Sequence, residues 1–254
     1  PILQYQVAGV SFYIHFEDYA EGRALLPSYE PFFVKQTDAP RIFTLTINKD
    51  AVDLNEAGKE IGQFDSLDSN HGVYLLPDGG YKMIVSNSRK EPAAAFITNS
   101  DFSSIKVSLF GNKRNWVFGL NNAIMIAFAF SGAQKDLLLI HASVTMKDGK
   151  GYLFLGKSGT GKSTHSQLWL KHIPGTELLN DDNPAVRLIN DEVIVYGTPW
   201  SGKTPCYKNK QVPIGAFVKL EQYPENIIRR EPPLKAFATL LTSTSSMLWD
   251  KPLY

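Results

Sequence analysis

The sequence has little cysteine, little net charge and no long uninterrupted apolar run. Cys206 is the only cysteine among 254 residues, so no disulfide can form within the chain and a reducing compartment is expected. The 26 lysines and arginines nearly balance the 25 acidic residues, and the formal net charge is +1. This balance argues against a general attraction to nucleic acid or to an anionic membrane. A cytoplasmic globular protein, with neither nucleic acid nor membrane as a partner, is therefore expected.

The most apolar stretch, residues 116–130, is too short to cross a membrane, which requires about 18 apolar residues. Asn121 and Asn122 also interrupt it. We therefore expect a buried helix within residues 112–136 that bridges two domains. The chain begins at Pro1 without a methionine and without the pattern of a signal peptide, which favours a processed or trimmed chain.

The pattern of apolar and turn residues in 1–111 predicts a small β-rich domain. Pro77-Asp78-Gly79-Gly80 separates two apolar segments and predicts a hairpin. His15 and His71 have no metal-ligating partners at suitable spacing, so structural roles are favoured for both. Nothing in this half indicates its task. The expected strands are 5–16, 41–47, 73–76, 81–85 and 105–110, and a packed loop is expected at 22–33.

Residues 156–163, Gly-Lys-Ser-Gly-Thr-Gly-Lys-Ser, match the phosphate-loop pattern G-x-x-x-x-G-K-[ST]. Glycines let successive backbone N–H groups point at an anion, and the following helix reinforces that site with its positive end. Lys162 is placed to contact the β- and γ-phosphates of ATP, and Ser163 to bind Mg²⁺. A chance match in a glycine-rich turn is the alternative, but the apolar run before the loop and the predicted helix at 161–172 favour a nucleotide site. The residues expected to contact ATP are Gly156, Ser158, Gly159, Thr160, Gly161, Lys162, Ser163 and Thr164.

A predicted hairpin leads into this loop. Residues 137–146 form the first expected strand, and Asp148-Gly149 is a strong turn signal before the second, at 151–155. If these two residues are the centre of the turn, His141 faces Gly156 and lies beside the phosphates. A register error of one residue would turn the histidine to the other face.

Asp181 and Asp182 follow the next expected strand, which starts at residue 177. An acid at the end of a strand downstream of a phosphate loop commonly serves Mg²⁺, and a second acid could accept a proton from an attacking hydroxyl. The alternative is a simple turn at residues 181–184, since Asp, Asn and Pro all favour turns. A hairpin at 185–196, a polar loop at 197–204, a strand at 212–220 and a helix from 234 to 241 complete the predicted order. This order gives residues 137–254 an α/β domain with a mixed sheet.

These residues resemble the catalytic domain of HPr kinase/phosphorylase, whose nucleotide-binding core is shared with ATP-dependent phosphoenolpyruvate carboxykinase. The resemblance covers residues 137–241 and rests on His141-Ala142-Ser143, the loop at 156–164, Asn180-Asp181-Asp182 and Gly197-Thr198-Pro199-Trp200. It implies that Ser163 and Asp181 serve the metal. It further implies that Asp182, helped by His141, acts as the base on a protein serine, and that the chain forms homo-oligomers.

The sequence departs from that family at several points. Lys157 stands where the family's loop has an acid, and the Glu-Ile-Arg-Gly-x-Gly stretch that serves the reverse reaction is missing. These departures indicate a divergent kinase that acts on a hydroxyl of a small molecule, a peptide or a protein, and they argue against phosphorolysis. In this hypothesis Asp182, His141 and Lys162 are the catalytic residues. The alternative is a non-catalytic nucleotide-binding protein that regulates or binds a partner.

Overall fold

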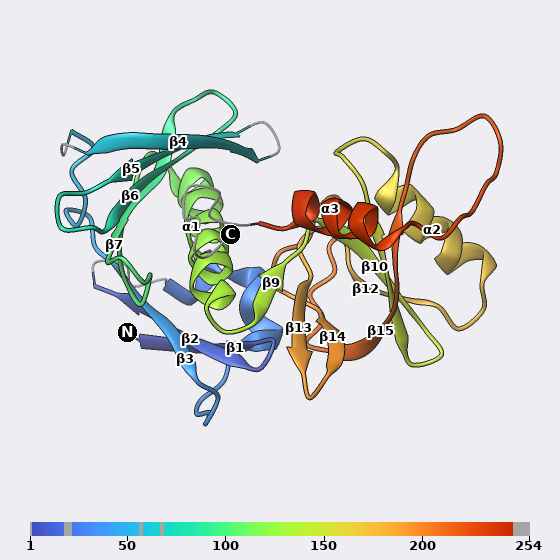
Figure 1. Cartoon of the computed structure of the whole chain (residues 1–254). Helices are drawn as coiled ribbons and strands as arrows, with labels where there is room; N and C mark the ends of the chain where they lie inside the picture. Colours follow the sequence, from blue (N-terminus) through green and yellow to red (C-terminus); the bar gives the residue numbers. More distant parts are fainter. Residues whose placement is uncertain (1, 18–21, 56–57, 67–68, 246–254) are drawn as a thin grey trace. The chain divides into compact units, whose positions relative to one another are not determined.

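The chain folds into two compact units, Pro1–Lys135 and Asp136–Ser246, in a computed structural model that describes residues 2–17, 22–55, 58–66 and 69–245 (Figure 1). Each unit contains one mixed sheet, so the predicted general class, α/β with a mixed sheet, is confirmed.

The first unit is built on an eight-stranded sheet in the order β1-β2-β3-β8-β7-β6-β5-β4. Pairing is parallel between β2 and β3 and between β3 and β8, and antiparallel elsewhere. The hairpin predicted around residues 77–80 is confirmed by the pairing of Leu75 with Tyr81. The strands are β1 (Ile2–Val7), β2 (Val10–Phe16), β3 (Arg41–Ile47), β4 (Lys59–Ser66), β5 (Ser69–Leu75), β6 (Tyr81–Ser86), β7 (Pro92–Thr98) and β8 (Ser104–Leu109).

Two features of this unit differ from the sequence prediction. The single strand expected at 5–16 is a hairpin, because Ala8 and Gly9 adopt positive φ angles of 50° and 74° and reverse the chain. Strands β4 and β7 were not predicted. The loop expected at 22–33 contains two short 3₁₀ helices, Gly22–Leu25 and Pro27–Phe32, which bury Tyr29 and Phe32.

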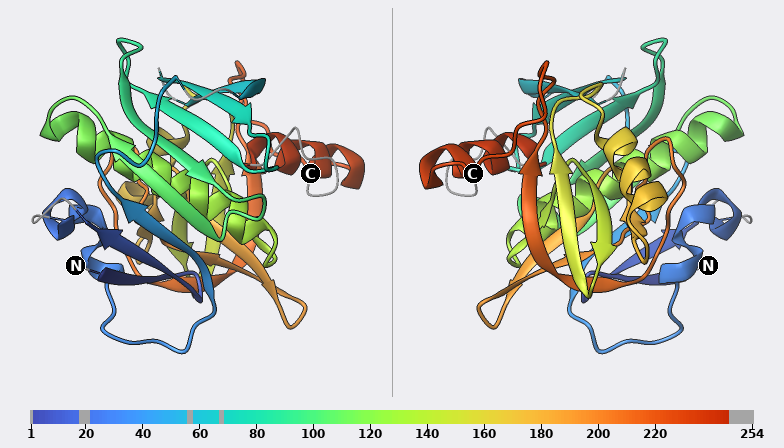
Figure 2. Two further views of the ribbon diagram at one scale, coloured as in Figure 1. Left: turned by 90° about the vertical axis from the view of Figure 1, so that its left-hand side faces the viewer. Right: turned by 90° about the vertical axis from the view of Figure 1, so that its right-hand side faces the viewer.

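Helix α1 (Lys113–Ala133) lies across one face of the first sheet, against β3, β6, β7 and β8 (Figures 1 and 2). The sequence assigned this segment to a bridge between domains, whereas the helix packs within the first unit and belongs to it. Its sequence is apolar on most sides because most sides are buried. Among the described residues α1 is also the one helix that is long and apolar enough to cross a membrane, and more than half of its most apolar window is buried inside the fold.

The second unit is built on a seven-stranded sheet in the order β12-β10-β11-β15-β14-β13-β9, in which only β11 and β15 run parallel. The expected strand at 137–146 is divided at His141. On one side of this residue β9 pairs with β13, and on the other β10 pairs with β11 and β12, so the chain changes partners there. The strands are β9 (Leu137–Leu139), β10 (Ala142–Lys147), β11 (Lys150–Leu155), β12 (Glu177–Asn180), β13 (Ala185–Ile189), β14 (Glu192–Tyr196) and β15 (Gln211–Lys219).

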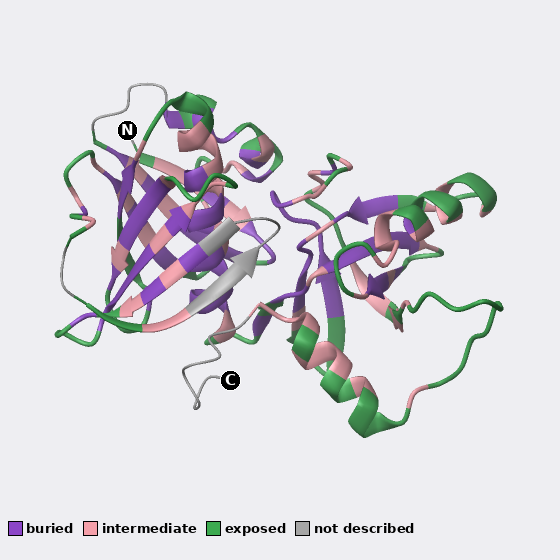
Figure 3. Cartoon of the chain, turned by 90° about the horizontal axis from the view of Figure 1, so that it is seen from above, coloured by how far each residue is buried: buried purple, intermediate pink, exposed green. Residues whose placement is uncertain are grey.

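Two helices accompany this sheet. Helix α2 (Lys162–His172) packs against β10, β11 and β12, where Trp169 and His165 contact the ring of Phe154. Helix α3 (Pro233–Ser243) has no buried residue, although Leu240 packs against the core of the unit (Figure 3). Beyond its C-terminal end, Thr244 forms an isolated bridge with Ile140, beside His141.

Gly119 in α1 provides a test of the packing in the first unit. A Cβ atom at this position would lie 2.6 Å from the carbonyl carbon of Ala93 and 2.8 Å from the Cβ of Ala94. Gly119→Ala should therefore destabilise the protein by about 1–3 kcal/mol through overpacking, although alanine favours helices. Arg114 is exposed, so Arg114→Ala should change the free energy of unfolding by no more than about 0.5 kcal/mol from wild type. Urea unfolding measures both, and a stabilised Gly119→Ala variant would contradict the close approach of helix and strand.

Candidate functional site

The glycine-rich loop joins β11 to α2 in the second unit. Gly156, Gly159 and Gly161 adopt positive φ angles of 152°, 82° and 108°, which residues with a side chain rarely adopt. Around Gly159 and Gly161 an added Cβ would meet nothing within 4 Å, so the loop backbone is open on that side. Thr160 closes the loop from within, since its N–H and its hydroxyl both donate to the Lys157 carbonyl, at 3.2 and 2.8 Å.

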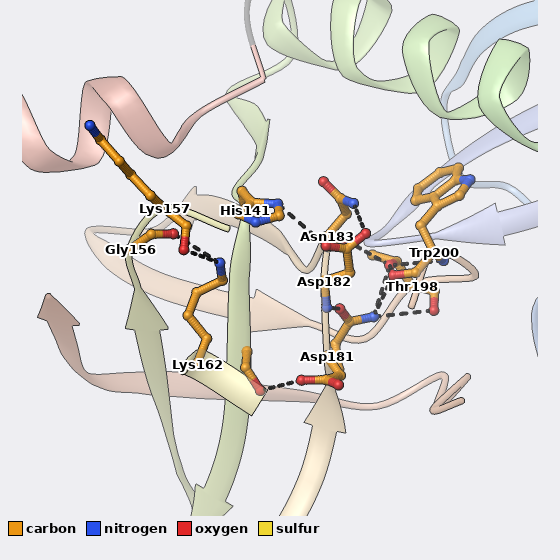
Figure 4. Close-up of polar contacts among 11 residues, drawn as sticks. His141, Gly156, Lys157, Lys162, Asp181, Asp182, Asn183, Thr198 and Trp200 are labelled. Atoms are coloured by element: carbon orange, nitrogen blue, oxygen red, sulfur yellow. Dashed lines mark hydrogen bonds and ion pairs between the residues drawn. The ribbon is translucent and has the colours of Figure 1, made fainter. Parts of the chain in front are cut away.

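Lys162 is the first residue of α2, and its side chain turns back over the loop (Figure 4). Its Nζ donates hydrogen bonds to the carbonyl oxygens of Gly156 at 2.8 Å and Lys157 at 3.3 Å. Burial lowers the pKa of this ammonium, and the negative charges of Asp182 and Asp181 partly offset that effect. The cation is therefore partly desolvated and lies in the field of both carboxylates.

His141 and Asp182 face each other across the site (Figure 4). The histidine Nδ1 lies 3.3 Å from the Asp182 Oδ1. Burial, with a smaller contribution from Lys162, lowers the pKa of His141 to about 4. The imidazole is therefore neutral at pH 7, and the contact is not a full ion pair.

The Asp182 carboxyl is also strongly shifted. Burial raises its pKa to about 6, against the lowering effect of the Lys162 charge. Asp181 raises this pKa further, whereas a hydrogen bond from the Asn183 amide, 2.7 Å from Oδ2, lowers it. His141 thus lies at one oxygen of the Asp182 carboxylate and Asn183 at the other.

Asn180, the last residue of β12, fixes the backbone that carries both carboxylates. It is fully buried, and its Oδ1 accepts the N–H of Asp182 at 2.9 Å. Its amide nitrogen donates to the Thr198 hydroxyl at 3.1 Å and to the Trp200 carbonyl at 3.0 Å. Because the two bonds to Thr198 and Trp200 are buried, Asn180 ties the polar loop after β14 to the end of β12.

Asp181 points in another direction and meets different donors. Its Oδ1 accepts from the Ser143 hydroxyl at 2.7 Å, and its Oδ2 accepts the Thr204 N–H at 3.3 Å. The Ser143 oxygen lies 2.6 Å from the hydroxyl of Ser166 on α2. Asp181, Ser143 and Ser166 are all buried.

The structure thus brings Lys162, His141, Asp181 and Asp182 together at one end of the second sheet. The β10–β11 pairing joins Ala142 to Leu155, which is the register predicted from the turn. Ser163 lies next to Lys162 in the first turn of α2 and is partly buried, whereas Ser158 and Thr164 are exposed.

Sequence reasoning assigned no role to Ser143, Ser166 or Thr204. Ser143 belongs to the quoted His141-Ala142-Ser143 stretch, and Ser166 follows Lys162 by one helical turn. The spacing of Ser166 after the loop was therefore the available signal. Among the described residues no cluster of three or more His, Cys, Asp or Glu side chains could enclose a metal.

No protein-family model matches the sequence, and comparison with curated proteins finds no significant match. Function must therefore be inferred from the geometry and chemistry of the site.

The shifted pKa of Asp182 predicts a pH-dependent stability difference. Between about pH 4 and about pH 6 the folded state retains a proton that the unfolded chain, with its ordinary pKa of 3.8, has lost. As the pH rises through this window, the free energy of unfolding of wild type should therefore fall by up to about 3 kcal/mol relative to that of Asp182→Asn. Urea unfolding of both proteins at several pH values measures the difference.

His141→Gln serves as the control with the opposite sign. The folded histidine binds its proton only below about pH 4, whereas the unfolded one binds it below about pH 6.5. Wild type should therefore gain stability relative to this variant as the pH rises. Parallel pH profiles for wild type and Asp182→Asn would contradict the buried, shifted carboxyl.

Proposed function

We propose that the second unit is an ATP- and Mg²⁺-dependent kinase that transfers the γ-phosphoryl group of ATP to a hydroxyl. The observation that carries the proposal is the convergence of Lys162 with Asp181, Asp182 and His141 beside an open glycine-rich loop. The resemblance of the same residues to HPr kinase/phosphorylase supports it. In this proposal residues 156–163 are a phosphate-binding loop. The acceptor is a serine of a peptide or protein, or a small molecule with a hydroxyl.

The loop suits a triphosphate for two physical reasons. Its backbone is free of side chains at Gly159 and Gly161, and it ends at the N-terminus of α2, where N–H groups and the helix dipole favour an anion. Lys162 now donates to two loop carbonyls, which are weaker partners for an ammonium than phosphate oxygens. The β- and γ-phosphates would replace those carbonyls at Nζ.

Mg²⁺ fits the donors that remain. This ion prefers oxygen ligands and usually takes one or two from the protein, completing its shell with water and substrate phosphates. Ser163 and Asp181 would supply those two. When bound, the ion would neutralise charge on the β- and γ-phosphates during transfer.

Asp182 would act as the general base. The acceptor's oxygen forms a bond to the γ-phosphorus, its proton passes to the Asp182 carboxylate, and the bond to the β–γ bridging oxygen breaks as ADP leaves. His141, neutral and 3.3 Å from the carboxylate, would hold it in position. Lys162 would stabilise the charge that develops on the moving phosphoryl group.

Replacing Lys162 should abolish most of the transfer. Lys162→Ala removes the only side-chain cation that this mechanism places on the phosphates and should lower the rate about a thousandfold. Lys171→Ala, an exposed lysine at the other end of α2, is the matched control and should leave the rate within about twofold. Transfer of label from γ-labelled ATP to serine, hydroxyl-bearing peptides and HPr measures both, and a fully active, folded Lys162→Ala would refute the proposal.

Replacing Asp182 should separate binding from chemistry. Asp182→Asn keeps the shape of the side chain but cannot accept the proton, so transfer should fall at least about a hundredfold while nucleotide affinity changes only a few-fold. Asp191→Asn, in the exposed turn between β13 and β14, is the matched control. Tight ATP binding without transfer in wild type, and no difference from Asp182→Asn, would favour the non-catalytic nucleotide-binding alternative.

A further inference from the structure

We propose that Ser166 and Ser143 form a directed hydrogen-bond relay that positions the Asp181 carboxylate for Mg²⁺. The relay connects the helix that carries Lys162 and Ser163 to the carboxylate on the opposite side of the site. This inference rests on the proposed function, because it gives Ser143 and Ser166 a purpose only if Asp181 serves the metal.

Counting hydrogens fixes the direction of the relay. The Ser143 hydroxyl has one hydrogen, and it donates that hydrogen to the Asp181 Oδ1 at 2.7 Å. At the 2.6 Å contact between the two hydroxyls, Ser166 must therefore be the donor and Ser143 the acceptor. Ser166 on α2 thus donates to Ser143, and Ser143 donates to the Asp181 carboxylate. In such a chain the hydrogen bonds strengthen each other.

The sheet topology explains why Ser143 occupies this position. Strand β10 lies between β12, which leads to Asp181, and β11, which leads to the glycine-rich loop. Within that arrangement Ser143 pairs with Phe154, and its neighbour Val144 pairs with Asn180. A short hydroxyl on the α2 face of this middle strand can therefore reach both the helix and the acid.

On α2, Ser166 lies one turn after the residues at the phosphate end. Positions three and four apart on a helix share a face, so Ser166 follows Ser163 and Lys162 on the same side. The relay therefore sets the distance between the first turn of α2 and Asp181. If Asp181 and Ser163 both bind one ion, this distance decides whether they can do so together.

Removal of the relay should lower the affinity for Mg²⁺ and leave the affinity for metal-free nucleotide unchanged. Outer hydrogen bonds to metal ligands typically contribute 10–100-fold to metal affinity. Mg²⁺ should tighten the binding of ADP, and we call the Mg²⁺ concentration at half of that effect the Mg²⁺ midpoint. For Ser143→Ala we expect the Mg²⁺ midpoint to rise about tenfold. Affinity for ADP in EDTA should stay within about twofold. Ser166→Ala should move the Mg²⁺ midpoint by a smaller factor in the same direction.

The double variant tests whether the two hydroxyls act as one unit. Ser166 reaches Asp181 only through Ser143, so Ser143→Ala/Ser166→Ala should titrate like Ser143→Ala alone. Thr145→Val is the matched control: Thr145 lies two residues further along the same face of β10, is fully buried, and its hydroxyl has no hydrogen-bond partner within the described part of the chain. Its Mg²⁺ midpoint should stay at the wild-type value.

The experiment is a calorimetric ADP titration at a series of Mg²⁺ concentrations, with the melting temperature of each variant measured alongside. If wild type binds ADP with the expected Mg²⁺ dependence but Ser143→Ala and Ser166→Ala titrate like it, the relay is refuted and the proposed function stands. Wild type without Mg²⁺-dependent ADP binding would overturn both. A shift in Thr145→Val equal to that of Ser143→Ala would show general repacking and also refute the relay. If Ser143→Ala does not fold, Ser166→Ala decides the test, because alanine is favourable within a helix.

Discussion

The tight turn between β10 and β11 determines which residues of the second unit can meet. Asp148 and Gly149 form it with positive φ angles of 50° and 72°, the conformation of a two-residue hairpin turn. With this turn, Ala142 pairs with Leu155, so His141, just before β10, and Gly156, just after β11, lie at the same end of the hairpin. A change of register by one residue would place the histidine and Ser143 on the wrong faces. The site therefore depends on backbone geometry several residues away from it.

Burial of two adjacent carboxylates is unfavourable unless donors compensate for lost water. The second unit supplies these donors mainly as neutral groups: Ser143 and the Thr204 N–H for Asp181, and Asn183 for Asp182. The Lys162 ammonium interacts with the charges of both acids but donates its hydrogen bonds to the loop. The raised pKa of Asp182 reports that compensation there is incomplete. A cationic ligand, such as a metal ion bound to a triphosphate, would complete it.

Local signals in the sequence predicted much of the fold. Turn residues predicted the hairpins around 77–80 and 148–149, and the glycine pattern placed the loop before α2. The hairpin at Ala8-Gly9 was missed because the flanking apolar residues run on almost without a break. The division of the strand at His141 was also missed, because pairing with β13 and with β12 depends on distant segments. The spacing of Ser166 after the loop placed it on the same helix face as Lys162, but its contact with Ser143 could not be predicted, because that contact depends on strand order and helix placement together.

The most direct test of the account is a crystal structure of the protein with Mn²⁺, as an anomalous substitute for Mg²⁺, and a non-hydrolysable ATP analogue. In that crystal, phosphate oxygens should lie within the glycine-rich loop, and Lys162 Nζ should have moved from the Gly156 carbonyl to the β- and γ-phosphates. An anomalous peak should also lie between Ser163 and Asp181. A nucleotide bound elsewhere, or bound in the loop with the metal far from Asp181, would contradict the account.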